Sequence, residues 1–275
     1  WSTCYQVGGL VATALATWIL HRSGWRAAFV GPALGLALVG ALVFFALPDE
    51  PRDHNTNTES SGASPDEALL RRNEQLRVLR SVTVWSYGVS YFAVKLIRYS
   101  LLFWLPFYLH TSLHYAEERA GYLSTSFEIG GIAGAILFGL LTDRVRRLSR
   151  PAWSALSLVG LAGALLLYTR VGTDPVVNFA AMALVGALLF GPDTVISGCA
   201  SQDLGGRYAA ATAAGLVNGI GSLGPILQGR FTAHVSERYG WNTLFDCFVA
   251  LSLLGALALV PGMITGVRDR AVRRD

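Results

Sequence analysis

Long apolar stretches alternate with short polar ones along most of the chain. About eight of these stretches approach or exceed the roughly 20 residues that an α-helix needs to cross a bilayer. We predict spans at residues 2–20, 26–47, 82–109, 120–141, 152–170, 176–199, 209–232 and 242–265. The pattern therefore predicts an all-α, polytopic membrane protein.

The longest polar segment, residues 48–80, separates the second predicted span from the third. It begins with Pro, Asn, Thr and Ser and ends in a basic, amphipathic stretch, which predicts a loop that is flexible at first and then forms a surface helix. We therefore expect two helices of one bundle at 1–47, a central loop at 48–80, a six-helix bundle at 81–265 and a basic tail at 266–275.

The arginines orient these spans. If the spans alternate in direction, most arginines fall on the side that carries the central loop and the C-terminus. The positive-inside rule then predicts that both are cytoplasmic. The topology thus accounts for the net charge of +4. We therefore expect the protein to contact the lipid bilayer and not to bind nucleic acid.

Two cations, Lys95 and Arg98, stand near the middle of the apolar stretch 82–109. A charge at that depth costs roughly 2.5–3.5 kcal/mol, and such residues usually face a water-filled functional cavity. On a helix they share a face with Tyr87 and Tyr91. We expect this face to bind a small anion. The alternative is that the cations reach an interface or are neutralised by a buried carboxylate.

Two acidic residues inside predicted spans leave alternatives open. Glu128 could be a proton-binding or gating group, or a structural hydrogen-bond acceptor. Asp193 follows a Gly-Pro pair at 191–192, which predicts a broken helix with unpaired carbonyls. It could pair with one of the two cations or cap the broken helix.

Glycines repeat at helical spacing in two of the predicted spans. We expect these pairs to allow close helix approach: Gly130 with Gly134, Gly215 with Gly219, and Gly221 with Gly224.

Reactive chemistry is not indicated. The three cysteines have no paired spacing, and the sequence contains no P-loop, no His/Cys cluster and no nucleophile beside a base. We therefore expect no enzyme activity, no metal site and no cofactor.

The segment GLLTDRVRR, residues 139–147, resembles the G-x-L-x-D-R-x-x-R signature of the major facilitator superfamily. The resemblance implies that Asp143, Arg144 and Arg147 form a cytoplasmic latch that breaks when the gate opens. A positive-inside loop would explain the arginines equally well, but it would not require Gly139 and Asp143 at these offsets.

The order of spans resembles the later part of a twelve-span protein of this superfamily, which is built as six plus six helices. Because the chain opens with Trp1 directly inside an apolar stretch, we expect it to lack about the first four helices.

Three further segments resemble one branch of that superfamily, the organophosphate:phosphate antiporters that carry glycerol 3-phosphate or hexose phosphates. They are WSTCYQVGG (1–9), KLIRYSLLFWLPFYL (95–109) and the segment from Gly191 to Pro225. The resemblance implies exchange of an organic phosphate for inorganic phosphate by alternating access. It also implies a bacterial inner-membrane location and a monomer.

In this resemblance Arg98 matches the phosphate-binding arginine, and Lys95, Tyr5, Gln6 and Tyr91 complete the expected substrate site. A guanidinium suits phosphate because it grips two oxygens at once. The chain departs from the family at two positions: Tyr5 replaces a histidine, and Lys95 replaces a tyrosine. The extra permanent charge allows a substrate with a second anionic group, such as a carboxylate.

Two other functions remain open. A membrane sensor of sugar phosphate could share this fold and signal through a partner, and a facilitator could carry another organic anion or nitrate.

Overall fold

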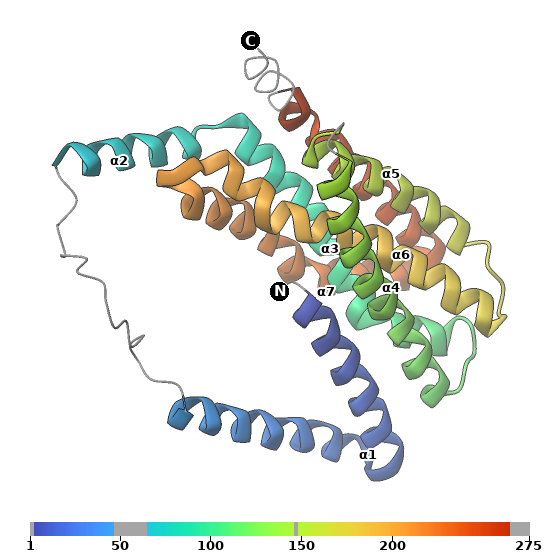
Figure 1. Cartoon of the computed structure of the whole chain (residues 1–275). Helices are drawn as coiled ribbons and strands as arrows, with labels where there is room; N and C mark the ends of the chain where they lie inside the picture. Colours follow the sequence, from blue (N-terminus) through green and yellow to red (C-terminus); the bar gives the residue numbers. More distant parts are fainter. Residues whose placement is uncertain (1–2, 47–64, 146–147, 265–275) are drawn as a thin grey trace.

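The computed structural model describes residues 3–46, 65–145 and 148–264, which are helical apart from short connections. The first stretch of the central loop, Arg147 and the tail lie outside these ranges. Figure 1 shows the helices in chain order: α1 (Thr3–Ala46), α2 (Pro65–Leu79), α3 (Val82–Thr111), α4 (Glu117–Arg144), α5 (Arg150–Tyr168), α6 (Pro175–Val195), a π-helical turn (Ile196–Ala200) and α7 (Ser201–Ala258).

Within the described ranges, six helices are long and apolar enough to cross a membrane. The two longest are bent at glycines with positive φ, Gly24 in α1 (φ 78°) and Gly240 in α7 (φ 86°), a conformation that residues with a Cβ rarely adopt. Figure 1 shows α1 as two arms that meet at an angle. Both glycines fall between predicted spans and have non-helical backbone, so each of these long elements consists of two helices that meet at a kink, as the sequence predicted.

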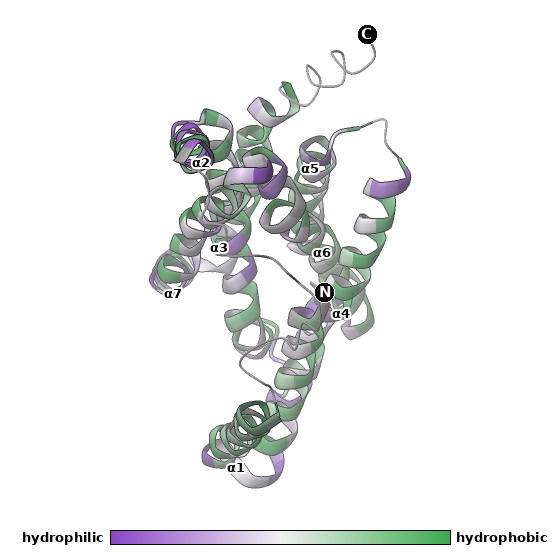
Figure 2. Ribbon diagram, turned by 60° about the vertical axis from the view of Figure 1, so that its left-hand side comes forward, coloured by the Kyte–Doolittle hydropathy of each residue, from purple (hydrophilic) through white to green (hydrophobic). Residues whose placement is uncertain are grey.

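The surface helix predicted at the end of the central loop is confirmed as α2. Figure 2 shows that α2 is largely hydrophilic, whereas apolar residues dominate the longer helices. Its first turn carries Asp66 and Glu67 and its last turn Arg77, the arrangement that a helix dipole favours.

Helices α3 to α7 pack into one bundle, in which α3 lies mainly against α7 and α4 lies mainly against α6. Aromatic rings fix one end of α3: Tyr108 lies 5.0 Å from Trp241 and 5.3 Å from Phe245, measured between ring centroids. Helix α1 contacts chiefly α4. Its second arm exposes large apolar side chains such as Phe29 and Phe44. Lipid or protein covers a surface of this kind in a membrane.

The close contact of α4 with α6 confirms the predicted role of Gly130 and Gly134. A Cβ at either position would overlap backbone atoms of α6, at Ala183 and Ala187 respectively. Helices in membranes use small residues in this way to bring their backbones together.

The other two glycine pairs on α7 differ from each other. A Cβ at Gly221 would overlap the ring of Tyr91, and one at Gly224 would lie 2.7 Å from the carbonyl oxygen of Phe92. Gly215 and Gly219 have nothing within 4 Å, so the predicted close approach is wrong for this pair.

The helix break predicted at residues 191–192 is also wrong. Helix α6 continues through Pro192 to Val195, and the irregular backbone comes later, at Gly198. Proline cannot donate to the carbonyl four residues earlier. That carbonyl, on Leu188, instead accepts a hydrogen bond of 2.7 Å from the Ser157 hydroxyl of α5. A neighbouring helix therefore satisfies the group that proline leaves unpaired.

Candidate functional site

The two cations of α3 are both largely buried, with a relative exposure of 8% for Lys95 and of 13% for the Arg98 side chain. Tyr87 and Tyr91 on the same face are buried as well. The cations therefore do not reach the membrane surface, and their charges must be balanced or solvated locally.

Arg98 is balanced by a carboxylate. Its Nη1 donates to Oδ2 of Asp193 on α6 at 2.8 Å. The guanidinium carbon also lies 4.6 Å from the centroid of the Phe190 ring, a cation–π contact. Asp193 thus pairs with one of the two cations. For Arg98, the structure shows the alternative that the sequence left open, in which a buried carboxylate neutralises the cation. The Arg98 Nε and the Asp193 Oδ1 have no hydrogen-bond partner among the described residues.

Lys95 is held differently. Its Nζ donates to Oδ1 of Asn218 at 2.7 Å and to Oγ of Ser222 at 3.0 Å, both on α7. The ammonium also lies 4.7 Å from the centroid of the Tyr91 ring. No carboxylate in the described ranges forms an ion pair with it. The hydrogen-bond partners of Lys95 in the described ranges are therefore neutral groups, whereas Arg98 is paired with a carboxylate.

Sequence reasoning missed Asn218 and Ser222. Their signal was the spacing of two polar residues four apart in an apolar helix, which puts both on one face.

Two further polar groups lie at the contact between α4 and α1. Glu128 is 3% exposed and its Oε2 has no partner in the described part of the chain. A Cβ at Gly9 of α1 would lie 3.1 Å from the Cδ of Glu128. Gln6, one turn before Gly9, is 1% exposed and its Oε1 is likewise unpartnered among these residues.

Helices α1, α3, α4 and α6 thus each place a buried polar side chain with unused hydrogen-bonding capacity: Gln6, Arg98, Glu128 and Asp193. Native proteins rarely leave such groups unsatisfied, and clusters of them mark sites for water or polar ligands. Of these atoms, the Arg98 Nε is a donor that an anion could engage, whereas the oxygens of Gln6, Glu128 and Asp193 are acceptors that suit water or the donor groups of a ligand.

Comparison with known proteins identifies the family. Residues 1–229 match the Major Facilitator Superfamily. The chain belongs to this superfamily. Superfamily membership agrees with the helical, polytopic architecture, and the protein is an integral membrane protein.

Relatives within the superfamily have names that refer to phosphate esters. The chain is 28% identical to sugar phosphate exchanger 3 of Bos taurus, covering 100% of this chain and 62% of that protein. It is 29% identical to putative glycerol-3-phosphate transporter 1 of Arabidopsis thaliana (98% and 57%), and 28% identical to glucose-6-phosphate exchanger SLC37A2 of Bos taurus (94% and 60%). The chain thus spans about 60% of the length of these relatives.

The superfamily signature lies at the C-terminal end of α4. Asp143 and Arg144 are exposed there, and neither forms an ion pair within the described ranges; Arg147 lies outside them. The ion pair that the structure shows here joins Arg150 of α5 to Asp203 of α7. The latch of the signature residues stays a prediction, as does the role of Tyr5, whose side chain lies outside the described part.

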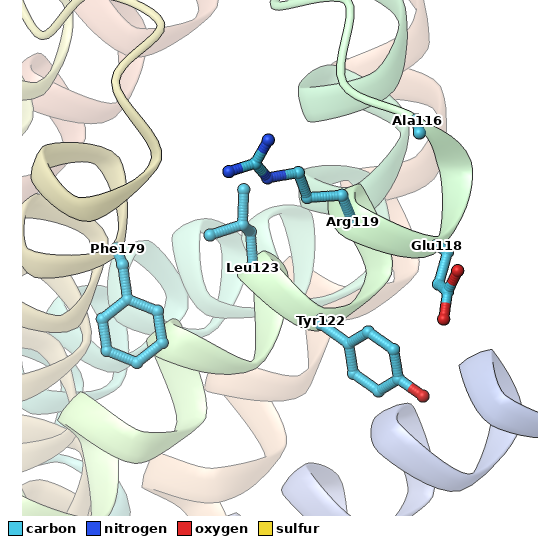
Figure 3. Close-up of a pocket in the computed structure, with 6 residues that line it drawn as sticks. All are labelled: Ala116, Glu118, Arg119, Tyr122, Leu123 and Phe179. Carbon is cyan, nitrogen blue, oxygen red and sulfur yellow. The ribbon is translucent and has the colours of Figure 1, made fainter.

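Two clefts lie near the start of α4, on the side opposite to the superfamily signature. Figure 3 shows the first, of about 430 Å³, with Leu123 of α4 facing Phe179 of α6. The second, of about 590 Å³, lies between α1, α3 and α4 and includes His21 and Glu118, whose side chains are 3.6 Å apart. Glu118 precedes Glu128 by ten residues on α4, or about 15 Å of helix, so these clefts are separate from the cation site.

Proposed function

We propose that this protein is a secondary active transporter that exchanges an organic phosphate for inorganic phosphate by alternating access. The observation that carries the proposal is the pair of buried cations on α3, which retain donors for an anion. The names of the relatives, exchangers and transporters of phosphate esters, support the same substrate class. These names, together with the lack of a catalytic motif in the sequence, support a carrier and not an enzyme.

Arg98 is the group that would grip the phosphate. Asp193 compensates the charge of Arg98 at 2.8 Å, because an unpaired buried guanidinium would be costly. The oxygens of an incoming phosphate can accept a hydrogen bond from the unused Nε of Arg98 and compete with Asp193 for the other N–H donors of the guanidinium. Binding would then exchange one anionic partner of Arg98 for another, which links the substrate on α3 to the position of α6.

Transport of a panel of anions tests this function. The protein expressed from its complete gene is reconstituted in liposomes loaded with inorganic phosphate, and uptake of labelled glycerol 3-phosphate, hexose phosphate, an organic carboxylate and nitrate is measured. We expect uptake of a phosphate ester only. Uptake confined to carboxylate or nitrate would indicate a different anion facilitator, and binding of a phosphate ester without flux would indicate a sensor.

We also propose the orientation given by the positive-inside rule, with the central loop and the C-terminus in the cytoplasm, and a monomer as the working unit. A bacterial plasma membrane remains the proposed location; the relatives named above come from an animal and a plant. A cysteine introduced into α2, which has no lysine or cysteine of its own, and labelled from one membrane side at a time measures the orientation directly.

Replacing Lys95 by tyrosine should change which anions are preferred without stopping transport. The change removes the cation held by Asn218 and Ser222 but leaves the Arg98–Asp193 pair. We expect the preference to shift toward substrates with a single phosphate group. Competition of glycerol phosphate, hexose phosphate and phosphoglycerate against labelled phosphate measures the shift, and an unchanged competition profile would contradict it.

Replacing Asp143 by asparagine should slow turnover more than it weakens binding. Asp143 lies at the end of α4, whereas the cation pair lies within α3, so it can act only by biasing conformational states. We expect substrate affinity to change less than about threefold, and accessibility to a cysteine reagent to increase at one membrane face. A large loss of affinity with unchanged accessibility would show that Asp143 mainly stabilises the fold.

A further inference from the structure

The partners of Lys95 on α7 have fixed hydrogen-bond directions. The Ser222 hydroxyl donates its only proton to the carbonyl oxygen of Asn218 at 2.8 Å, so its oxygen can only accept from Lys95. An ammonium group has donors and no acceptor, so Asn218 must turn its Oδ1 toward Lys95. The amide NH₂ of Asn218 therefore points away from the ammonium.

This geometry leaves donors unused. Lys95 has three N–H groups, of which Asn218 and Ser222 take two. Asn218 is exposed at this face of α7, and its amide N–H groups make no hydrogen bond within the ranges the structure describes. Lys95 and Asn218, which are hydrogen-bonded to each other, thus each keep unused donors, and no ion pair within the described ranges neutralises the ammonium.

We propose that Lys95, Asn218 and Ser222 form a second anion subsite beside Arg98, and that Asn218 is a specificity-determining residue. The subsite would take a second anionic group of the substrate, such as the carboxylate of a phosphorylated organic acid, while Arg98 takes the phosphate. Ser222 positions the ammonium and does not itself bind the ligand. This inference rests on the proposed function, because it assigns the second group of the same substrate.

Two reasons support a separate subsite over one phosphate shared by both cations. Lys95 and Arg98 are held by different helices, α7 and α6 respectively. Residues three apart on a helix have Cβ atoms about 5–6 Å apart, a spacing that two charged groups on one small molecule can bridge.

A matched pair of competitors tests the proposal. Phosphoglycerate and glycerol 3-phosphate share a carbon skeleton, and only the first carries a carboxylate. Both compete with labelled inorganic phosphate for uptake by the reconstituted protein, in the wild type and in Asn218→Asp. This substitution keeps an acceptor for Lys95 but replaces the N–H donors by an anionic oxygen.

We expect phosphoglycerate to lose at least about tenfold in inhibitory potency in Asn218→Asp, the loss expected for one charge-assisted hydrogen bond. Glycerol 3-phosphate should change by less than about threefold. Asn242→Asp makes the same chemical change at an exposed position further along α7, and it should leave both competitors unchanged.

Equal losses for both competitors, or no loss for either, would overturn the role of Asn218 while phosphate uptake itself persists. If the wild type takes up no phosphate, the proposed function fails first. Should Asn218→Asp not fold, Ser222→Ala and Ser222→Thr replace it. Loss of the hydroxyl should weaken phosphoglycerate alone, threonine should restore it, and identical profiles for the two variants would contradict the subsite.

Discussion

Replacing Arg98 by lysine is expected to abolish phosphate exchange although the charge is conserved. A lysine is a compact point charge and cannot present two parallel N–H donors. The variant would also lose the contact of the planar guanidinium with the Phe190 ring. We expect the initial rate of exchange of labelled phosphate across proteoliposomes to fall by at least about a hundredfold, since charge-assisted hydrogen bonds contribute about 1.5–3 kcal/mol each.

The matched control is Arg119→Lys. This variant makes the same substitution at the start of α4, where Arg119 lines the remote cleft in Figure 3. Its rate of phosphate exchange should remain near that of the wild type. Thermal unfolding of both variants separates loss of the site from loss of the fold. Near wild-type exchange by a folded Arg98→Lys variant would remove Arg98 from the substrate site.

Replacing Gly130 by alanine should cause the largest loss of stability. A Cβ at this position overlaps the backbone of Ala183, and a backbone cannot move aside as a flexible side chain can. Helices α4 and α6 would have to separate along their closest contact, at a cost of about 1–3 kcal/mol or more. The thermal midpoint of the purified protein in detergent should therefore fall by several degrees.

Gly163→Ala on α5 provides the comparison. Nothing lies within 4 Å of a Cβ at Gly163, and alanine favours a helix by about 1 kcal/mol over glycine. This variant should unfold at the wild-type temperature or slightly above it. Equal midpoints for the two alanine variants would show that α4 and α6 do not pack as closely as described.

The sequence predicted the helices well because the length of an apolar stretch is a local property. Residues 82–109, for example, became α3 at Val82–Thr111. The error at Pro192 has a physical cause that no local pattern contains: the carbonyl that proline leaves unpaired is satisfied by Ser157 of another helix. The bends at Gly24 and Gly240 lie where the sequence expected loops.

The site was only partly predictable for the same reason. The spacing of Lys95 and Arg98 placed both cations on one face, and the low exposure of both side chains agrees with that placement. Which of them Asp193 would pair with depends on how α6 packs against α3. The Lys95–Asn218 hydrogen bond joins residues 123 positions apart. The four-residue spacing of Asn218 and Ser222 indicates that they share a helix face, but not which residue of another helix they contact.

The most direct test of the central claim is phosphate efflux from proteoliposomes that contain the wild-type protein and labelled inorganic phosphate. External buffer without substrate is compared with the same buffer containing an organic phosphate. The account predicts that label leaves rapidly only when organic phosphate is outside, and that Arg98→Lys removes this dependence by stopping efflux altogether. Efflux at the same rate into both buffers, or no efflux into either, would contradict exchange as the function of this protein.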